Sequence, residues 1–168
     1  LAELEGKDLI TADELDKIDR MCNSLFNHSK VRDLVNTSKR EEPFIWYINR
    51  MHCKDIINAK GKVDLQSFDF IADIKTTAEF GGIDKFKYDC KKYHYDMQAA
   101  FYCDALGLDQ FKFIVIGKED PHSVGIYDVS PEFLESGRRK YLYALDLYEK
   151  YFLSCDENID SYIEEGIL

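Results

Sequence analysis

A series of short strand-like segments, divided by one helical segment, constrains the fold of this chain more than any other feature. Segments 44–48, 60–66 and 70–76 either alternate in polarity or are rich in aromatic and β-branched residues, at strand length. A segment with helical spacing, 93–106, follows them and ends at Gly107, and two more strand-like segments, 111–116 and 124–129, come after it. This order predicts one α/β domain.

Further helices are predicted at both ends of this core. Thr11 and Glu14 have the spacing of a capping box before an amphipathic helix, and a shorter helical pattern covers 31–35. Ser130 and Pro131 begin a long last helix. The stretch 81–92, which opens with two glycines, is interpreted as a polar connection that bears lysines. We therefore expect a single domain over 1–168, with N-terminal helices at about 11–36 and a core at about 41–168.

Composition and charge exclude several classes of protein. The chain has 168 residues and a net charge of −10, which argues against a basic nucleic-acid wrapper or a membrane-surface binder. Its 5 cysteines have no C-x-x-C spacing, so neither a disulfide framework nor a zinc site is indicated. No stretch has the length or apolarity of a membrane span or a signal peptide, so a cytoplasmic protein is expected. Since the first residue is Leu1, we also expect the chain to be truncated at its N-terminus.

Two carboxylates and a lysine are candidates for a catalytic centre. Strand geometry places Asp73 and Lys75 on one face of segment 70–76, and Asp64 lies nine positions earlier in a segment that can pair with it. Mg²⁺ prefers oxygen ligands, commonly one or two carboxylates completed by water and phosphate. A lysine beside such a site can hold or deprotonate an attacking water. The alternative interpretation is an ordinary solvent-facing alternation of Asp and Lys.

The helix that follows carries polar side chains along one face. Tyr95, Gln98 and Tyr102 lie at i, i+3 and i+7, so two phenols and an amide are presented together. A purely apolar core face is not usually built in this way. The competing interpretation is two half-buried tyrosines and an exposed glutamine.

These motifs, in this order, resemble the PD-(D/E)xK nuclease superfamily, and in particular its RecB-like and RecE-like branch. Asp73-Ile74-Lys75-Thr76-Thr77 and the segment from Tyr95 to Tyr102 look like the exonuclease VIII type of phage and prophage exonucleases. Gly61-Lys62-Val63-Asp64, Glu119-Asp120-Pro121 and Gly137 to Tyr141 are similar as well. Val63 stands where the superfamily has its name-giving proline, a change that RecB-like members often tolerate.

The resemblance implies both a fold and an activity. The fold is a restriction-endonuclease-like core, in which a central mixed β-sheet is flanked by helices. The activity is Mg²⁺-dependent hydrolysis of DNA phosphodiester bonds, with Mn²⁺ as a possible substitute, often as processive 5′-to-3′ digestion of one strand from linear duplex ends. Such enzymes commonly form homo-oligomeric rings and act in recombination beside a RecT-like single-strand annealing protein. The expected location is the cytoplasm of a bacterial or phage-infected cell, with no membrane partner.

The resemblance also assigns roles to single residues. Asp64 and Asp73 match the metal-binding aspartates, Lys75 matches the catalytic lysine, and the Ile74 carbonyl completes the metal ligands. Gln98 and Tyr102 match the motif that braces the site and contacts DNA. The family has an upstream glutamate as well, which corresponds here to Glu41 or Glu42, and the spacing to Trp46 favours Glu41.

Contacts with DNA are expected to be local because the net charge is negative. Four lysines lead into the Gln98 helix and are placed near the phosphate backbone, with Tyr95 and Gln98 beside them: Lys85, Lys87, Lys91 and Lys92. A solvated loop is the alternative for these lysines. Two other functions remain open, namely a nuclease of this fold with a single-strand or structure-specific substrate, and a non-catalytic DNA-binding or assembly module.

Overall fold

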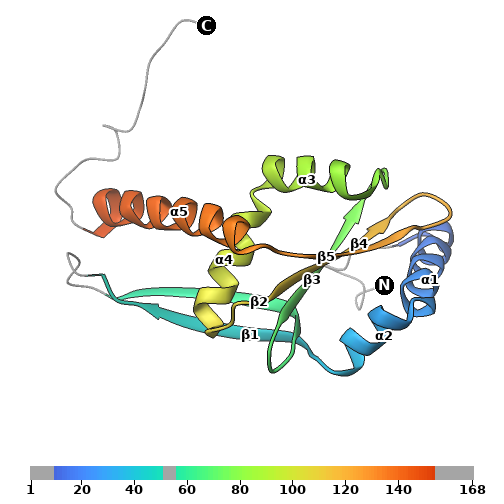
Figure 1. Cartoon of the computed structure of the whole chain (residues 1–168), viewed down its shortest axis with the longest axis horizontal. Coiled ribbons are helices and arrows are strands. Elements are labelled where there is room, and N and C mark those ends of the chain that lie inside the picture. The colour runs from blue at the N-terminus through green and yellow to red at the C-terminus, as the bar shows by residue number, and fades with distance from the viewer. Residues whose placement is uncertain (1–9, 51–55, 154–168) are drawn as a thin grey trace, which may run out of the picture.

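The computed structural model describes residues 10–50 and 56–153, which form one α/β unit (Figure 1). The helices are α1 (Ala12–Asn27), α2 (Ser29–Asn36), α3 (Gly82–Tyr93), α4 (Tyr95–Leu106) and α5 (Pro131–Tyr148), followed by a π-helical turn, η2 (Glu149–Leu153). The strands are β1 (Lys39–Ile48), β2 (Ile57–Gln66), β3 (Ile71–Thr77), β4 (Phe111–Gly117) and β5 (Val124–Asp128).

The strands form a five-stranded mixed sheet in the order β1-β2-β3-β4-β5. Strands β3 and β4 run parallel, with Asp73 opposite Phe113, and the other three pairs are antiparallel. A parallel pair needs a crossover connection, and α3 and α4 supply it. The mixed sheet flanked by helices confirms the predicted fold class.

Helices cover the two faces of the sheet unequally. On one face, side chains from α3, α4 and α5 pack with Ile71, Phe113 and Val115 in the larger core. On the other face, α2 packs over the middle of the sheet, where its Val31 and Val35 meet a smaller apolar cluster. Figure 1 shows α1 beside the β4–β5 hairpin and α2 leading into the start of β1, while the far end of the long β1–β2 hairpin lies away from both helices. The hairpin therefore has one covered face and one open face.

Strand β2 changes faces at Asp64. Val63 belongs to the core under α3, α4 and α5, whereas Leu65 belongs to the cluster under α2. Side chains two residues apart in a regular strand share a face, so the backbone is irregular between them. Opposite Asp64, Glu41 has φ +55°, and the ladder of β1 and β2 skips that pair of residues. Only Leu65 and Gln66 pair with β3, so β2 and β3 separate beyond Asp64.

The interpretation of 81–92 as a connection is wrong, because this stretch forms α3. Phe86, Asp89 and Cys90 are buried at i, i+3 and i+4, which is the spacing of a helix face against a core. The glycine pair lies at the start of the helix, where Gly82 has φ +68°. The lysines hid the pattern, since Phe86 and Cys90 are separated mainly by polar residues.

The predicted helix ends are confirmed. The Thr11 hydroxyl accepts from the Glu14 amide at 3.2 Å while the Glu14 carboxylate accepts from the Thr11 amide at 2.8 Å. Gly107 ends α4 with φ +68°, and Ser130 caps α5 with Pro131 in its first turn. Strand β1 begins at Lys39, five residues before the predicted strand. Within the described residues no helix has the length and apolarity required to cross a membrane.

Candidate active site

The candidate site is centred on three side chains from β3 and α4. The Gln98 amide nitrogen donates to Asp73 Oδ1 at 2.8 Å, and its amide oxygen accepts from Lys75 Nζ at 2.9 Å. Lys75 Nζ also lies 2.8 Å from Asp73 Oδ2. The predicted common face for Asp73 and Lys75 is therefore confirmed, and it points into the helix-covered core and not into solvent. Gln98 holds the carboxylate and the ammonium in one fixed arrangement.

Asp73 is buried, and one of its oxygens is left incompletely satisfied. Its exposed fraction is 4%, and within the described residues Oδ2 accepts no hydrogen bond of good geometry despite the nearby ammonium. Burial raises the pKa of Asp73, and the charge of Asp64 adds to this, while Lys75 and Gln98 oppose it. A buried carboxylate oxygen without such a bond is unusual and costs stability, which favours a role in binding.

Asp64 lies where β2 and β3 separate. Its Oδ2 accepts from the Ile74 amide at 2.7 Å, so a side chain replaces the backbone partner that β2 would otherwise supply. The carboxylate is half-buried, and it is close enough to Asp73 to affect its pKa. The irregularity of β2 thus brings the second carboxylate to the edge of the Asp73 site.

These donors fit a hard divalent cation. Asp64 and Asp73 offer two carboxylates on neighbouring strands, and Oδ2 of Asp73 lacks a well-formed hydrogen bond. In residues 10–50 and 56–153 no three acidic, histidine or cysteine side chains gather around one point. Magnesium commonly takes one or two protein carboxylates and completes its shell with water and phosphate, and Mn²⁺ accepts the same oxygen ligands, so the pair suits these cations better than it suits a metal that prefers imidazole or thiolate.

An aromatic ring also contacts the lysine of the site. Lys75 Nζ lies 4.6 Å from the centroid of the Tyr95 ring, within the range of a cation–π contact. The ring is fixed by Tyr93, stacked at 5.7 Å, and by Phe113 at 5.7 Å. Burial raises the pKa of Tyr95, so the phenol is neutral. The predicted DNA-contacting Tyr95 thus lies against Lys75.

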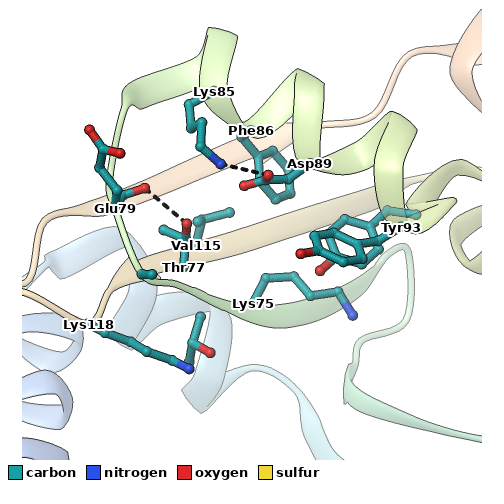
Figure 2. A pocket seen from close by; sticks show the side chains of 12 residues that line it. Lys75, Thr77, Glu79, Lys85, Phe86, Asp89, Tyr93, Val115 and Lys118 are labelled. Atoms are coloured by element: carbon teal, nitrogen blue, oxygen red, sulfur yellow. Dashed lines mark hydrogen bonds and ion pairs between the residues drawn. The ribbon is translucent and has the colours of Figure 1, made fainter.

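A pocket of about 370 Å³ opens beside Lys75, between the end of β3 and α3 (Figure 2). Its lining includes Lys75, Lys85, Asp89 and Lys118, with Tyr93 on the wall nearest Lys75. Lys85 Nζ lies 2.7 Å from Asp89 Oδ1, the ion pair drawn in Figure 2. The pocket therefore adjoins the candidate site at Lys75 and is lined by several charged side chains.

The remaining predicted site residues lie around the β1–β2 hairpin. Glu41 is exposed and its carboxylate forms an ion pair with Lys62, whose pKa it raises. Glu42 is half-buried opposite Val63. Tyr102 packs edge-on against Phe44 at 5.4 Å and not against Asp73 or Lys75. The structure thus brings together Asp64, Asp73, Lys75 and Gln98, while a metal-binding role for Glu41 or Glu42 stays a prediction.

The four predicted DNA-contacting lysines all lie on α3. Lys85 is paired with Asp89 at the pocket, and Lys87 lies 3.6 Å from Asp84. Lys91 is exposed, and Lys92 lies over the Tyr93 ring at 5.0 Å. Two of these charges are partly offset by neighbouring acids, so their DNA role stays a prediction.

The sequence matches, over residues 2–154, the family described as "PDDEXK-like domain of unknown function (DUF3799)". The chain belongs to this family. No curated protein matches the sequence. The family match covers the predicted motif order and agrees with the superfamily expected from it, while leaving substrate and activity open.

A solved structure shares the fold of this PDDEXK-like domain at low identity. A crystal structure of a "Putative exonuclease" from Eubacterium rectale superposes with a TM-score of 0.65 and 14% identity over 97% of this chain. The chain spans 66% of the length of that protein. A phage related exonuclease from Haemophilus somnus 129PT has a TM-score of 0.49 and 15% identity, covering 88% of this chain and 76% of its own. The first of these supports a shared fold.

Two ion pairs join α5 to α4, the helix that carries Gln98, and we call them the brace: Arg138 with Asp104, and Lys140 with Asp96. Arg138 forms a bidentate pair with Asp104, with Nε–Oδ2 at 2.8 Å and Nη2–Oδ1 at 2.6 Å, and the Tyr141 hydroxyl donates to the same carboxylate. At the other end of α4, Lys140 Nζ lies 2.6 Å from Asp96 Oδ2. The partners of Arg138 and Lys140 could not be predicted from the sequence, because they lie more than thirty positions away.

The two helices of the brace cross at very short distance. A Cβ added to Gly137 would lie 1.8 Å from the Asp96 carbonyl oxygen, so only glycine fits at this point of α5. This contact sets the position of the α4 start, where Tyr95 and Gln98 project toward β3.

Proposed function

We propose that this chain is a metal-dependent deoxyribonuclease, and specifically a RecE-like exonuclease that digests linear duplex DNA from its 5′ ends. The observation that carries the proposal is the bridge Asp73–Gln98–Lys75, with Asp73 Oδ2 buried and incompletely satisfied beside Asp64. A purely structural role would not explain why two carboxylates lie side by side when one of them is buried and the ammonium of Lys75 is the one partner of its Oδ2 among the described residues.

In this proposal Asp64, Asp73 and the Ile74 carbonyl hold Mg²⁺ or Mn²⁺. When bound, the cation would lower the pKa of water and stabilise charge on the phosphate oxygens. Lys75 holds the attacking water by a hydrogen bond from Nζ and stabilises negative charge as the P–O bond breaks. Gln98 and the Tyr95 ring keep Nζ in position, and water supplies the proton that the departing oxygen takes up.

Partners follow from the same resemblance and are part of the proposal. We expect a homo-oligomeric ring around DNA and a RecT-like annealing protein that takes over the remaining strand. The lysines of α3, Lys85, Lys87, Lys91 and Lys92, would contact phosphates near the pocket beside Lys75. Glu41 or Glu42 would complete the ligand set once Lys62 releases Glu41.

Nucleotide release from DNA tests the function. The purified protein is incubated with linear and covalently closed duplex DNA, in Mg²⁺ or EDTA, and acid-soluble nucleotide is measured beside an Asp73→Asn control. We expect release from linear DNA alone, in Mg²⁺ alone, and none from the variant. Blunt duplexes labelled at the 5′ or 3′ end then give the polarity.

Other outcomes would favour one of the two alternative functions. Release from single strands or from nicked circles, with linear duplex left intact, would replace the proposal with a nuclease of different substrate. DNA binding without any release in Mg²⁺ or Mn²⁺ would indicate a binding module.

A further inference from the structure

The open face of the β1–β2 hairpin carries apolar and basic side chains that the core does not explain. We call it the ribbon face: Pro43, Ile45 and Tyr47 on β1, with Lys60 and Lys62 on β2. Ile45 is 64% exposed and Tyr47 is 65% exposed, and both lysines are exposed. The opposite face of the same hairpin is packed, with Phe44 and Trp46 against Phe101 of α4. Packing within residues 10–50 and 56–153 therefore does not account for Ile45 and Tyr47.

The register sorts these side chains into two parallel rows. Ile45 lies opposite Lys60 and Pro43 opposite Lys62, so an apolar row on β1 runs beside a basic row on β2. A shallow depression of about 540 Å³ is lined by residues 43–45 and 60–62. A row of cations beside a row of apolar and aromatic groups is the arrangement by which proteins hold single-stranded nucleic acid.

The basic row leads to the candidate site. Lys60 and Lys62 lie two positions apart on β2, about 7 Å, and Asp64 follows two positions later, at the point where β2 changes faces. Asp64 lies at the point where β2 departs from β3, with its carboxylate on the Ile74 amide. A strand that follows the lysines would therefore reach Asp64 at the gap between β2 and β3, from the face opposite to the Asp73 side chain.

The charges of this face suit a polyanion in a chain that is acidic overall. The chain carries a net charge of −10, yet the ribbon face has two lysines and no carboxylate. Glu41, at its inner end, is paired with Lys62. A phosphate can replace that carboxylate as the partner of Lys62, which would free Glu41 beside Asp64.

We propose that the ribbon face binds a single-stranded DNA segment, with its phosphates along Lys60 and Lys62 and its bases on Ile45 and Tyr47, and delivers it to Asp64. This inference rests on the proposed function, since it concerns the substrate of the same site. Because every base has a π-face, binding of this kind is independent of sequence.

Binding of a fluorescent oligonucleotide by the full chain in EDTA tests the proposal. Tyr47→Ser should weaken binding of single-stranded DNA roughly fivefold or more, because one stacking partner is lost. Lys60→Ser should lower the slope of log Kd against log salt by about 0.7, the value for one phosphate contact to a single strand. In Mg²⁺, both variants should cut single-stranded tails more slowly than wild type.

Matched surface variants provide the controls. Tyr143→Ser removes a tyrosine of equal exposure, 64%, from α5, and Lys30→Ser removes an exposed lysine from α2. Neither should alter DNA binding. Thermal denaturation of all four variants checks that they fold, which is expected because each changed side chain is exposed.

The outcomes separate this proposal from the function on which it rests. If wild type cuts DNA but Tyr47→Ser and Lys60→Ser bind single strands as wild type does, the ribbon proposal alone fails. It also fails if these substitutions change the oligomeric state in light scattering and leave DNA binding intact, since the face would then join two copies. Wild type that neither binds nor cuts any DNA would remove both proposals.

Discussion

Two carboxylates, Asp73 and Asp104, both contact or lie on α4 and are bonded in different ways. Asp73 accepts a hydrogen bond from Gln98 of α4, but its Oδ2 is left without a well-formed bond, and burial raises its pKa. Asp104 lies on α4 itself and accepts two bonds from Arg138 and one from Tyr141. The Arg138 bonds lower the pKa of Asp104 below its ordinary value despite partial burial.

The difference shows which of the two carboxylates can still bind a ligand. A carboxylate with all its bonding positions used stabilises the fold and has no capacity for a ligand. Asp73 retains that capacity at a cost in stability, which is the trade expected of a functional group. The predictions below separate the two roles, from the largest expected effect to the smallest.

Removing the Asp73 charge should abolish cleavage and spare the fold. For Asp73→Asn we expect at least about a 10³-fold fall in nucleotide release, because a proposed metal ligand and a buried charge are both lost. The variant should still fold, since the Asn oxygen still accepts from Gln98, although loss of the ion pair with Lys75 offsets the gain from removing the buried charge. A variant that folds and still releases nucleotide would end the assignment of Asp73.

Breaking the brace should lower stability and leave cleavage almost unchanged. Arg138→Met leaves the Asp104 carboxylate without its cation and should lower the free energy of unfolding by about 2–4 kcal/mol in urea denaturation. Cleavage per folded molecule should change little. Arg139→Met is the matched control, because Arg139 is exposed and its loss should cost less than about 0.5 kcal/mol. Equal effects of the two substitutions would contradict the brace.

Loss of the Gln98 bridge should impair activity without large instability. Gln98→Met keeps the length of the side chain but removes both hydrogen bonds, to Asp73 and from Lys75. We expect a 10- to 100-fold loss, about the usual effect of removing a group that orients a metal ligand. In a Mg²⁺ titration, the variant should need a higher Mg²⁺ concentration than wild type to reach half of its maximal activity. Gln110→Met, at an exposed glutamine, is the control and should behave as wild type.

The two carboxylates should give opposite pH dependences of stability. The pKa of Asp104 is lowered on folding, so its stabilisation is present above the ordinary value of 3.8 and lost as pH falls through the folded value. The advantage of wild type over Asp104→Asn should therefore be constant near neutrality and shrink below about pH 4.

For Asp73 the sign is reversed, because its pKa is raised on folding. The ionised group destabilises the folded chain once pH rises above 3.8, so Asp73→Asn should gain on wild type as pH increases from 3 to 7. Urea denaturation at several pH values measures both trends. Parallel trends for the two variants would contradict the comparison.

The smallest effect is expected at Tyr95. Tyr95→Leu removes the ring over Lys75 and should slow cleavage about three- to tenfold, whereas Tyr95→Phe keeps the ring and should remain near wild type. The ratio of the cleavage rates of these two variants separates the effect of the ring from the effect of the hydroxyl. If both variants lose activity equally, the hydroxyl and not the cation–π contact is what Lys75 requires.

Much of the architecture could be predicted because it depends on local signals. The capping box at Thr11 and the glycine at 107 are visible in a few residues, and both end helices where expected. The spacing of Asp73 and Lys75 predicted a shared face, and the motif order predicted the superfamily to which the family match belongs. The helix at 82–93 was missed because its buried positions are few and its lysines resemble a solvated connection.

The sequence by itself determined most of the elements and the superfamily, and it singled out the carboxylates that we propose as metal ligands, since periodicity, capping and motif order are properties of neighbouring positions. Tertiary structure alone decided which of these residues meet. It placed Gln98 between Asp73 and Lys75, paired Glu41 with Lys62, and joined Arg138 to Asp104 across 34 positions. It also turned β2 over at Asp64 and left the ribbon face open. Such contacts depend on the packing of distant segments, on which local spacing carries no information.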